Sequence, residues 1–282
     1  MVKRIITGAC YVAVVVGFFL LKFFWRAVAF DALLWFFCAF GTFELVRATK
    51  GFAMPCGFWT GIVSGALLPA GYVIAEYFLK KWIALYIVLG AAVALALALL
   101  IVKFITKDTI KRWGVTILSI FYPFLGVLAM MILNDVNGKA GITGLLLVFV
   151  IPALSDTFAY FVGVIYNTIK KGNAKRIFPT VSPNKTYAGA IGALFGGALG
   201  GFLVYVIFKP KPRIAAPMLI FTFIGLVASI VNMFGDLFES YIKRKVGIKD
   251  MGNIMPGHGG VLDRIDGMVF TSIYILLMMF LM

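Results

Sequence analysis

The chain has 282 residues, of which 62% are hydrophobic and only 13% are charged, and its mean hydropathy is +1.03. A soluble domain of this size carries about a quarter charged residues, so the composition excludes an ordinary soluble enzyme. Apolar runs of about 20 residues recur from end to end, which is the length a helix needs to cross a bilayer. Because these runs are continuous rather than alternating, a transmembrane β-barrel is not expected. The predicted fold class is all-α, a polytopic integral membrane protein.

The formal net charge is +15, but the basic residues are spread over the connections between apolar runs. That distribution favours membrane topology, anionic lipid surfaces or phosphorylated substrates over a nucleic-acid partner, which is not expected. The three cysteines show no CxxC spacing and predict neither a disulfide framework nor a metal site. Lys3 and Arg4 precede an apolar run without a clear cleavage site, so a retained first helix is expected.

About nine transmembrane helices are expected along the chain. They cover residues 5–21, 27–46, 57–79, 82–102, 113–133, 142–166, 187–208, 214–238 and 267–282. The last is short for a hydrocarbon core of about 30 Å, so it begins earlier, tilts, or thins the bilayer. We expect one membrane domain, 1–282, in which residues 1–140 form a helical scaffold or lipid-facing part and residues 141–282 the catalytic part.

The distribution of Lys and Arg predicts the orientation. The N-terminus and the even-numbered connections carry 18 of these residues, against eight on the opposite side. The positive-inside rule therefore places the N-terminus in the cytoplasm and, with nine spans, the C-terminus outside. The connections around residues 167–185 and 240–266 would both be cytoplasmic. The compact size and the lack of a targeting segment favour a bacterial inner membrane.

Glycines recur in the expected span 187–208, at positions 189, 192, 196 and 200, with two more at 197 and 201. GxxxG steps let helix backbones approach closely. Two interpretations stay open: ordinary packing within the chain, or the face of a homodimer.

Acidic side chains gather near the ends of the later spans. Asp236 and Glu239 are three residues apart, as are Asp263 and Asp266, and this spacing puts each pair on one helix face. Several carboxylates near a membrane surface repel one another unless a cation neutralises them, and hard cations such as Mg²⁺ take oxygen ligands. Pairing of each acid with a nearby Lys or Arg is the alternative. The candidate metal ligands are Asp236, Asp263, Asp266, Asp156 and Glu239.

The stretch from Ser240 to Asp266 also holds bases, glycines and the chain's single histidine. Its Lys and Arg side chains are candidates for holding phosphate oxygens, although a plain positive-inside connection is the alternative. The sequence Pro256-Gly257-His258-Gly259-Gly260 predicts a turn whose backbone N–H groups could form an anion nest. His258 either contacts a phosphate, moves a proton, or is structural.

A second polar stretch, Ser182-Pro183-Asn184-Lys185-Thr186, precedes the glycine-rich span. Ser182 or Asn184 is expected to cap that helix, whose N-terminus would attract anions. Acids that bind a cation, surrounding bases and a glycine-rich turn together favour phosphoryl or nucleotidyl transfer. The sequence has no Walker GxxxxGK[ST], no GxSxG and no HExxH.

At these residues the chain resembles the phosphatidate cytidylyltransferase (CDP-diacylglycerol synthase) family. The family signature is similar to S-x-x-K-R-x4-K-D-x5-P-G-H-G-G-x2-D-R-x-D, and the chain matches every fixed position between Ser240 and Asp266. Four further places also resemble the family: the start of the chain at residues 3–8, Glu44, the block 156–160 and the block 182–186. One departure is Ala188, where the family usually has Glu.

The resemblance implies transfer of CMP from CTP to phosphatidic acid, giving CDP-diacylglycerol and pyrophosphate, with Mg²⁺ and possibly a second cation. It implies a polar cavity that membrane lipids reach from the side. The implied catalytic residues are Asp236, Asp263, Asp266, His258 and Lys243. The implied substrate-binding residues are Ser182, Pro183, Lys185, Thr186, Ser240, Arg244, Lys249, Asp250, Gly257, Gly259, Gly260 and Arg264.

Two other functions are alternatives. A CTP-dependent lipid kinase, such as a polyprenol kinase, would share nucleotide and metal but release CDP instead of pyrophosphate. An ion or phosphate transporter would use Asp156 as an intramembrane carboxylate, but the ionisable residues gather at one membrane side rather than along a midplane path. A CDP-alcohol phosphatidyltransferase is disfavoured, because Asp266-Gly267 is not followed by Ala-Arg.

Overall fold

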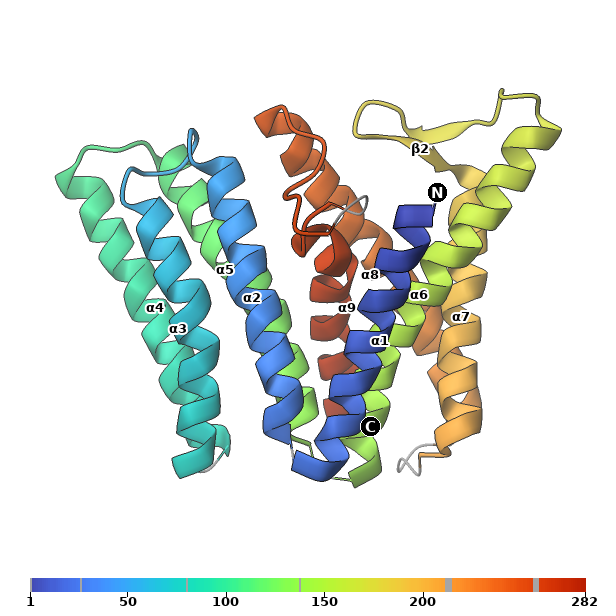
Figure 1. The fold of residues 1–282 in the computed structure, drawn as a ribbon, viewed down its shortest axis with the longest axis horizontal. Helices are drawn as coiled ribbons and strands as arrows, with labels where there is room; N and C mark the ends of the chain where they lie inside the picture. Colours follow the sequence, from blue (N-terminus) through green and yellow to red (C-terminus); the bar gives the residue numbers. More distant parts are fainter. Residues whose placement is uncertain (1, 26, 80, 137, 211–214, 256–258) are drawn as a thin grey trace. The chain divides into compact units, whose positions relative to one another are not determined.

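The computed structural model describes residues 1–282 except 1, 26, 80, 137, 211–214 and 256–258. Helices dominate the described residues, and one short β-hairpin joins two of them (Figure 1). In chain order the elements are α1 (Val2–Trp25), α2 (Ala27–Thr49), α3 (Gly57–Phe78), α4 (Lys81–Ile105), α5 (Ile110–Asn134), α6 (Gly138–Ile169), β1 (Arg176–Phe178), β2 (Ser182–Thr186), α7 (Tyr187–Phe208), α8 (Pro217–Val246) and α9 (Leu262–Leu281).

The helices α2 to α9 are each long and apolar enough to cross a membrane. Within α1, the stretch Thr7–Lys22 forms a shorter apolar helix, so among the described residues eight long candidates and one shorter one match the expected set. The predicted all-α polytopic membrane fold is confirmed.

The two helix boundaries that differ most from the sequence prediction both lie beside the polar stretch. Helix α8 does not end near residue 238 but continues to Val246, and α9 begins at Leu262 rather than at 267. The prediction ended the helix where the charged residues lower its hydropathy. Lys243, Arg244 and Lys245 nevertheless stabilise the last turn of the helix, because their positive charges interact with its negative end. The connection between the helices therefore shrinks to residues 247–261, and α9 gains the 20 residues that a span needs.

The chain divides into two compact units. Unit 1 comprises Met1–Leu128 and Val246–Ile265, and unit 2 comprises Ala129–Lys245 and Asp266–Met282. The expected functional division near residue 140 stays a prediction. The core of unit 1 is formed by large apolar side chains that are fully buried, among them Phe30, Leu34, Tyr72, Ile120 and Phe124.

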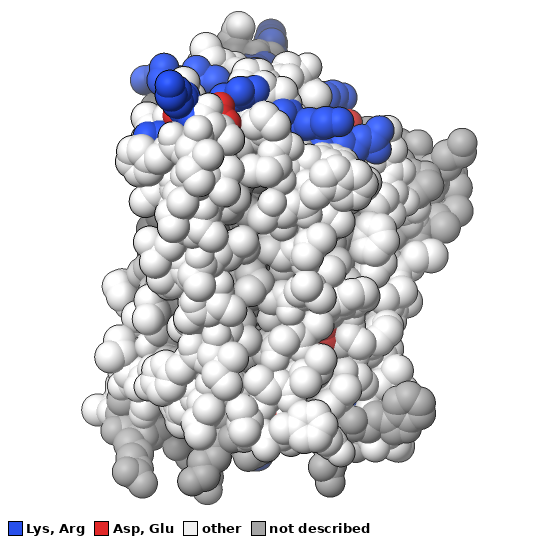
Figure 2. All heavy atoms as spheres, turned by 90° about the vertical axis from the view of Figure 1, so that its left-hand side faces the viewer, with Lys and Arg blue, Asp and Glu red and all other residues white. Residues whose placement is uncertain are grey.

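The surface of α3 and α4 in unit 1 suits contact with lipid. Trp59, Leu67 and Ile74 on α3 and Leu97 and Ile101 on α4 are all exposed. Figure 2 shows this face, on which Lys and Arg gather at one end and the long surface that the described residues form beyond them is white except for a small acidic patch. An apolar band bordered by basic residues is typical of a membrane-spanning helix that ends at charged headgroups.

In unit 2, glycines of α7 contact helices on two sides. A Cβ atom at Gly192 would lie 2.7 Å from the carbonyl oxygen of Phe158 in α6, so the two backbones are nearly in contact. On the other side, a Cβ at Gly197 would meet the carbonyl of Gly225 and the side chain of Ser229 in α8. These glycines therefore serve packing within the chain. The predicted homodimer gains no support from them and stays a prediction.

The hairpin of β1 and β2 was not expected from the sequence. The two strands pair antiparallel, with Arg176 opposite Thr186 and Phe178 opposite Ser182. Thr186 ends β2 and caps α7, because its hydroxyl accepts a hydrogen bond from the backbone N–H of Gly189 at 3.0 Å. The expected capping by Ser182 or Asn184 is wrong, since the strand continues past both residues.

The close packing of α7 predicts the effect of a single methyl group. Gly197→Ala should lower the stability of the protein by about 1–3 kcal/mol, because the new Cβ would overlap α8. Gly90→Ala in α4 is the matched control, since its Cβ would meet no atom within 4 Å. Thermal unfolding in detergent measures both, and equal unfolding temperatures for the two variants would contradict the packing described.

Candidate active site

A cavity of about 280 Å³ lies in unit 2, where the hairpin meets three helices. Polar side chains come from each side of it, together with apolar ones. Its lining consists of Asp156, Ala159 and Tyr160 of α6, Ile177, Ser182, Asn184, Lys185 and Thr186 of the hairpin region, Gly189 and Ala190 of α7, and Met233 and Asp236 of α8. The structure therefore brings together the predicted residues Asp156, Ser182, Lys185, Thr186 and Asp236.

Two polar interactions organise the acids of this cavity. The Lys185 ammonium lies 2.6 Å from Asp236 Oδ2 and also donates to the carbonyl of Met233 at 3.4 Å. The amide of Asn232, a buried residue of α8, donates to Asp156 Oδ1 at 2.9 Å. The hairpin and α6 are thus each joined to α8 through a carboxylate.

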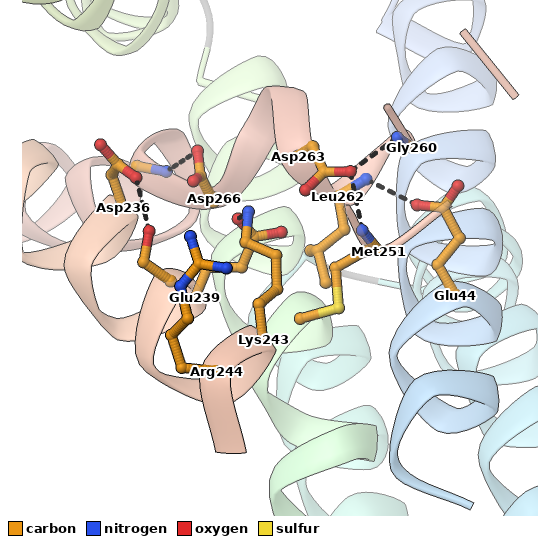
Figure 3. Close-up of polar contacts among 12 residues, drawn as sticks. Glu44, Asp236, Glu239, Lys243, Arg244, Met251, Gly260, Leu262, Asp263 and Asp266 are labelled. Carbon is orange, nitrogen blue, oxygen red and sulfur yellow. Dashed lines mark hydrogen bonds and ion pairs between the residues drawn. The ribbon is translucent and has the colours of Figure 1, made fainter. Parts of the chain in front are cut away.

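Helix α8 carries a polar stripe on one face, as the spacing of the sequence predicts (Figure 3). The Lys243 ammonium lies 2.5 Å from Oε2 of Glu239, a side chain that is fully buried. Ser240 Oγ donates to Asp236 Oδ1 at 3.3 Å. These groups have partners on their own helix, and Asp236 has a further one in Lys185, as is expected where an unpaired charge is costly to bury.

Asp266 of α9 faces this stripe. It interacts with Asp236, Glu239 and Lys243, all three from α8. Glycines allow the two helices to approach so closely: a Cβ at Gly235 would lie 2.8 Å from both the carbonyl oxygen of Asp266 and the Cα of Gly267. Three carboxylates and one ammonium group therefore share one small region of unit 2.

Two predicted phosphate-binding segments contact each other. Arg244 Nε donates to the carbonyl of Val181, in the turn of the hairpin, at 3.3 Å. Arg176 of β1 donates to the carbonyl of Pro183 in β2. Arg244 therefore links the end of α8 to the hairpin, and its predicted contact with a phosphate stays a prediction.

The remaining predicted site residues of unit 1 lie in the connection before α9 and at the start of that helix. Asp263 Oδ2 accepts hydrogen bonds from the backbone N–H groups of Met251, at 2.9 Å, and Gly260, at 2.7 Å (Figure 3). Gly259 has a φ of +87°, a conformation that strongly favours glycine. Asp263 thus fixes the backbone on both sides of the expected turn.

Three other predicted site residues can be described by their exposure. Lys249 and Asp250 are exposed in the connection after α8, and Arg264 is half-buried in the first turn of α9. Gly257 and His258 lie outside the described residues.

Comparison with known proteins decides the family. A protein-family model described as "Cytidylyltransferase family" matches residues 2–282. The chain belongs to this family. The relatives include proteins named phosphatidate cytidylyltransferase from Helicobacter pylori (strain ATCC 700392 / 26695), 39% identical over 56% of this chain and 53% of that protein, and from Brucella abortus (strain 2308), 36% identical over 55% and 53%. These matches span about half the length of those relatives. A protein of the same name from Bacillus subtilis (strain 168) is 31% identical over 99% of this chain and 98% of its own length.

The carboxylates suit a hard cation of the kind a cytidylyltransferase would use with its nucleotide. Among the described residues, no group of three His, Cys, Asp or Glu side chains is arranged to hold a metal ion. Asp236 and Asp266 nevertheless interact as a pair of oxygen donors, with Glu239 beside them. Mg²⁺ usually takes one or two carboxylates and completes its shell with phosphates and water. The residues present fit that arrangement.

Sequence reasoning missed several residues of the cavity. Asn232, the partner of Asp156, is a single amide inside an apolar run, and Tyr160 and Met233 carry no spacing signal. Ala188, the position at which the sequence predicts a departure from the family pattern, lies in the first turn of α7 beside Gly189 and Ala190, both of which line the cavity.

We expect substitution of Lys243 to lower the stability of the protein more than substitution of Lys185, because their carboxylate partners are buried to different degrees. Lys243→Met should destabilise the protein by about 3 kcal/mol, because it removes the ammonium partner of the fully buried Glu239. Lys185→Met should cost less than about 1 kcal/mol, because the Asp236 side chain of its pair is 39% exposed. Thermal unfolding of the two variants side by side measures the difference, and similar losses would show that burial does not govern these pairs.

Proposed function

We propose that the chain is a phosphatidate cytidylyltransferase, which converts CTP and phosphatidate into CDP-diacylglycerol and pyrophosphate. The observation that carries this proposal is the complete polar signature between Ser240 and Asp266, on a chain aligned with the Bacillus subtilis protein over nearly its full length. The cavity of unit 2 supports it, since acids, bases and apolar side chains line the same space.

In the proposed reaction an oxygen of the phosphatidate phosphate attacks the α-phosphorus of CTP. A new P–O–P bond forms, the bond between the α-phosphorus and its bridging oxygen breaks, and pyrophosphate leaves with that oxygen. The nucleophile is already anionic, so the chain needs no strong general base. The main task is to bring two anions together in line, which positioning and electrostatic stabilisation can achieve.

The side chains of unit 2 suit this task. Asp236 and Asp266 would hold Mg²⁺, which supplies charge neutralisation and alignment of the attacking and leaving oxygens. Lys185 forms an ion pair with Asp236, and Lys243, which pairs with Glu239, also interacts with Asp266. Their ammonium groups would therefore contact phosphates that share the cation. Asp156 and Glu239 remain predicted ligands in the same proposal, and the metal-binding role expected of Asp263 in unit 1 stays a separate prediction.

The surroundings of the cavity suit a lipid substrate. Ala159, Ile177 and Met233 give its lining an apolar part next to the acids. Tyr160 is 63% exposed, and Ile191 on α7 is 68% exposed. In a membrane-spanning helix such exposed side chains contact lipid. A phosphatidate molecule could therefore keep its acyl chains in the membrane while its headgroup reaches the acids.

We also propose that the site faces the cytoplasm, where CTP is made, and that the membrane is the bacterial inner membrane. The excess of Lys and Arg on one set of connections supports this orientation. It predicts that an epitope tag placed after Met282 is reached only from the outer side. Antibody or protease accessibility in sealed right-side-out and inverted vesicles measures this, and access from the inner side would overturn the orientation.

The activity is tested with purified protein, phosphatidate, Mg²⁺ and CTP labelled at the α-phosphate. The expected result is label in the lipid fraction together with release of pyrophosphate. Transfer of a γ-label instead would identify a CTP-dependent lipid kinase. Transfer of neither label would contradict both enzymatic functions and favour the transporter alternative.

The carboxylates are tested in the same assay. Asp236→Asn and Asp266→Asn should each lower kcat by at least about 100-fold, because each removes a charged ligand for the cation. Asp108→Asn is the control, because Asp108 belongs to unit 1 and pairs with Arg112 of the same unit. Near-normal activity in either site variant would remove that residue from the proposed metal site.

A further inference from the structure

Glu44 is a buried acid of unit 1 to which the proposed reaction assigns no role. It lies in the second half of α2, and only 2% of its surface is exposed. Its carboxylate points toward the start of α9, 218 residues further along the chain, where Oε2 accepts a hydrogen bond from the backbone N–H of Leu262 at 2.9 Å (Figure 3). A negative charge is favourable there, because the first N–H groups of a helix have no partner inside it.

Two glycines of the connection before α9 pack directly on this carboxylate. A Cβ atom added at Gly252 or at Gly260 would overlap its oxygens. Neither glycine has a positive φ among the described backbone angles, so the constraint at both positions is space. The backbone of the connection therefore touches Glu44 at two separate places.

The same connection is held by a second acid. Asp263 accepts hydrogen bonds from the N–H groups of Met251, which is next to Gly252, and of Gly260 itself. The backbone N–H of Met255 donates to the carbonyl of Gly259 at 2.9 Å, which joins the ends of the turn. Two carboxylates and one backbone bridge thus define the path of the chain before and after residues 256–258.

Burial of Glu44 is costly for the fold. Among the residues that the structure describes, its Oε1 atom is buried without a hydrogen bond of standard geometry, although the backbone N–H of Val261 also interacts with the carboxylate. A buried polar atom that lacks a partner destabilises a protein, and one that persists calls for an explanation. An apolar side chain would fill the same volume at lower cost, but it could not accept the Leu262 N–H.

We propose that Glu44 is a positioning residue, which holds the connection between α8 and α9 in a conformation ready to bind the nucleotide. Its kinetic consequence rests on the proposed function. A loosened connection must be ordered again when CTP binds, so loss of Glu44 should raise KM for CTP more than it lowers kcat.

The first experiment measures hydrogen exchange by mass spectrometry in detergent, without substrate. Amides of residues 251–262 should exchange about tenfold faster in Glu44→Ala than in the wild type, because the acceptor for Leu262 is lost. Glu44→Gln keeps an oxygen acceptor and should stay close to the wild type. Cys38→Ala, which shortens another buried side chain of α2, is the control and should leave this segment unchanged.

A second single variant keeps the proposal testable if the Glu44→Ala protein fails to fold, and a double-mutant cycle follows if it does fold. Gly252→Ala places a methyl group against the Glu44 carboxylate and should speed exchange of the same segment on its own. Combined with Glu44→Ala it should add little, because the carboxylate is gone. Gly51→Ala is the matched control, since its Cβ would meet no atom within 4 Å.

The outcomes separate this proposal from the proposed function. Exchange in residues 251–262 that is unchanged in Glu44→Ala and in Gly252→Ala would overturn the positioning role, whatever the enzyme assay shows. Faster exchange in a protein that never transfers label from CTP would support the anchoring and refute the cytidylyltransferase activity. Where activity is present, a KM for CTP raised about fivefold, with kcat within about twofold and recovery in Glu44→Gln, is the expected kinetic result.

Discussion

A carboxylate at the end of an apolar helix must be neutralised where it lies, and the polar part of this protein follows from that requirement. Two kinds of partner meet it. In unit 2 two of the carboxylates have lysine partners, in the pairs of Lys185 with Asp236 and of Lys243 with Glu239. In unit 1, Glu44 and Asp263 accept hydrogen bonds from backbone N–H groups. Lysines can turn to an incoming phosphate, whereas backbone groups fix the chain that carries them.

Small residues make this arrangement possible. The glycines of α7 let its backbone touch α6 on one side and α8 on the other, so the cavity beside Gly189 is framed by helices instead of filled by side chains. Gly235 has the same effect between α8 and α9 and brings Asp266 to the stripe of α8. Each added methyl group would separate charges that now interact, so packing and electrostatics are constrained together.

Hydropathy was sufficient to predict the membrane fold, and the bounds of α7 agree with the predicted 187–208. It failed where apolar and charged residues share one helix, because α8 continues through Lys243 to Val246. The hairpin was missed since β2 contains Pro183 and is too short for an alternating pattern. Glu44 shows why the site could be predicted only in part. The resemblance to the family drew attention to this residue, but its contact with Leu262 depends on tertiary structure that no local spacing encodes.

Helix α8 runs without interruption from Pro217 to Val246, and this continuity restricts how the sequence can change in length. One inserted residue would rotate everything beyond it by about 100°. An insertion between Ser229 and Asn232 would leave the contact with α7 in place but turn the acids and Lys243 away from Asp266. Even an insertion of about seven residues, which restores the face, would shift these groups along the helix axis by about 10 Å. Insertions and deletions in this helix are therefore tolerable only near its ends.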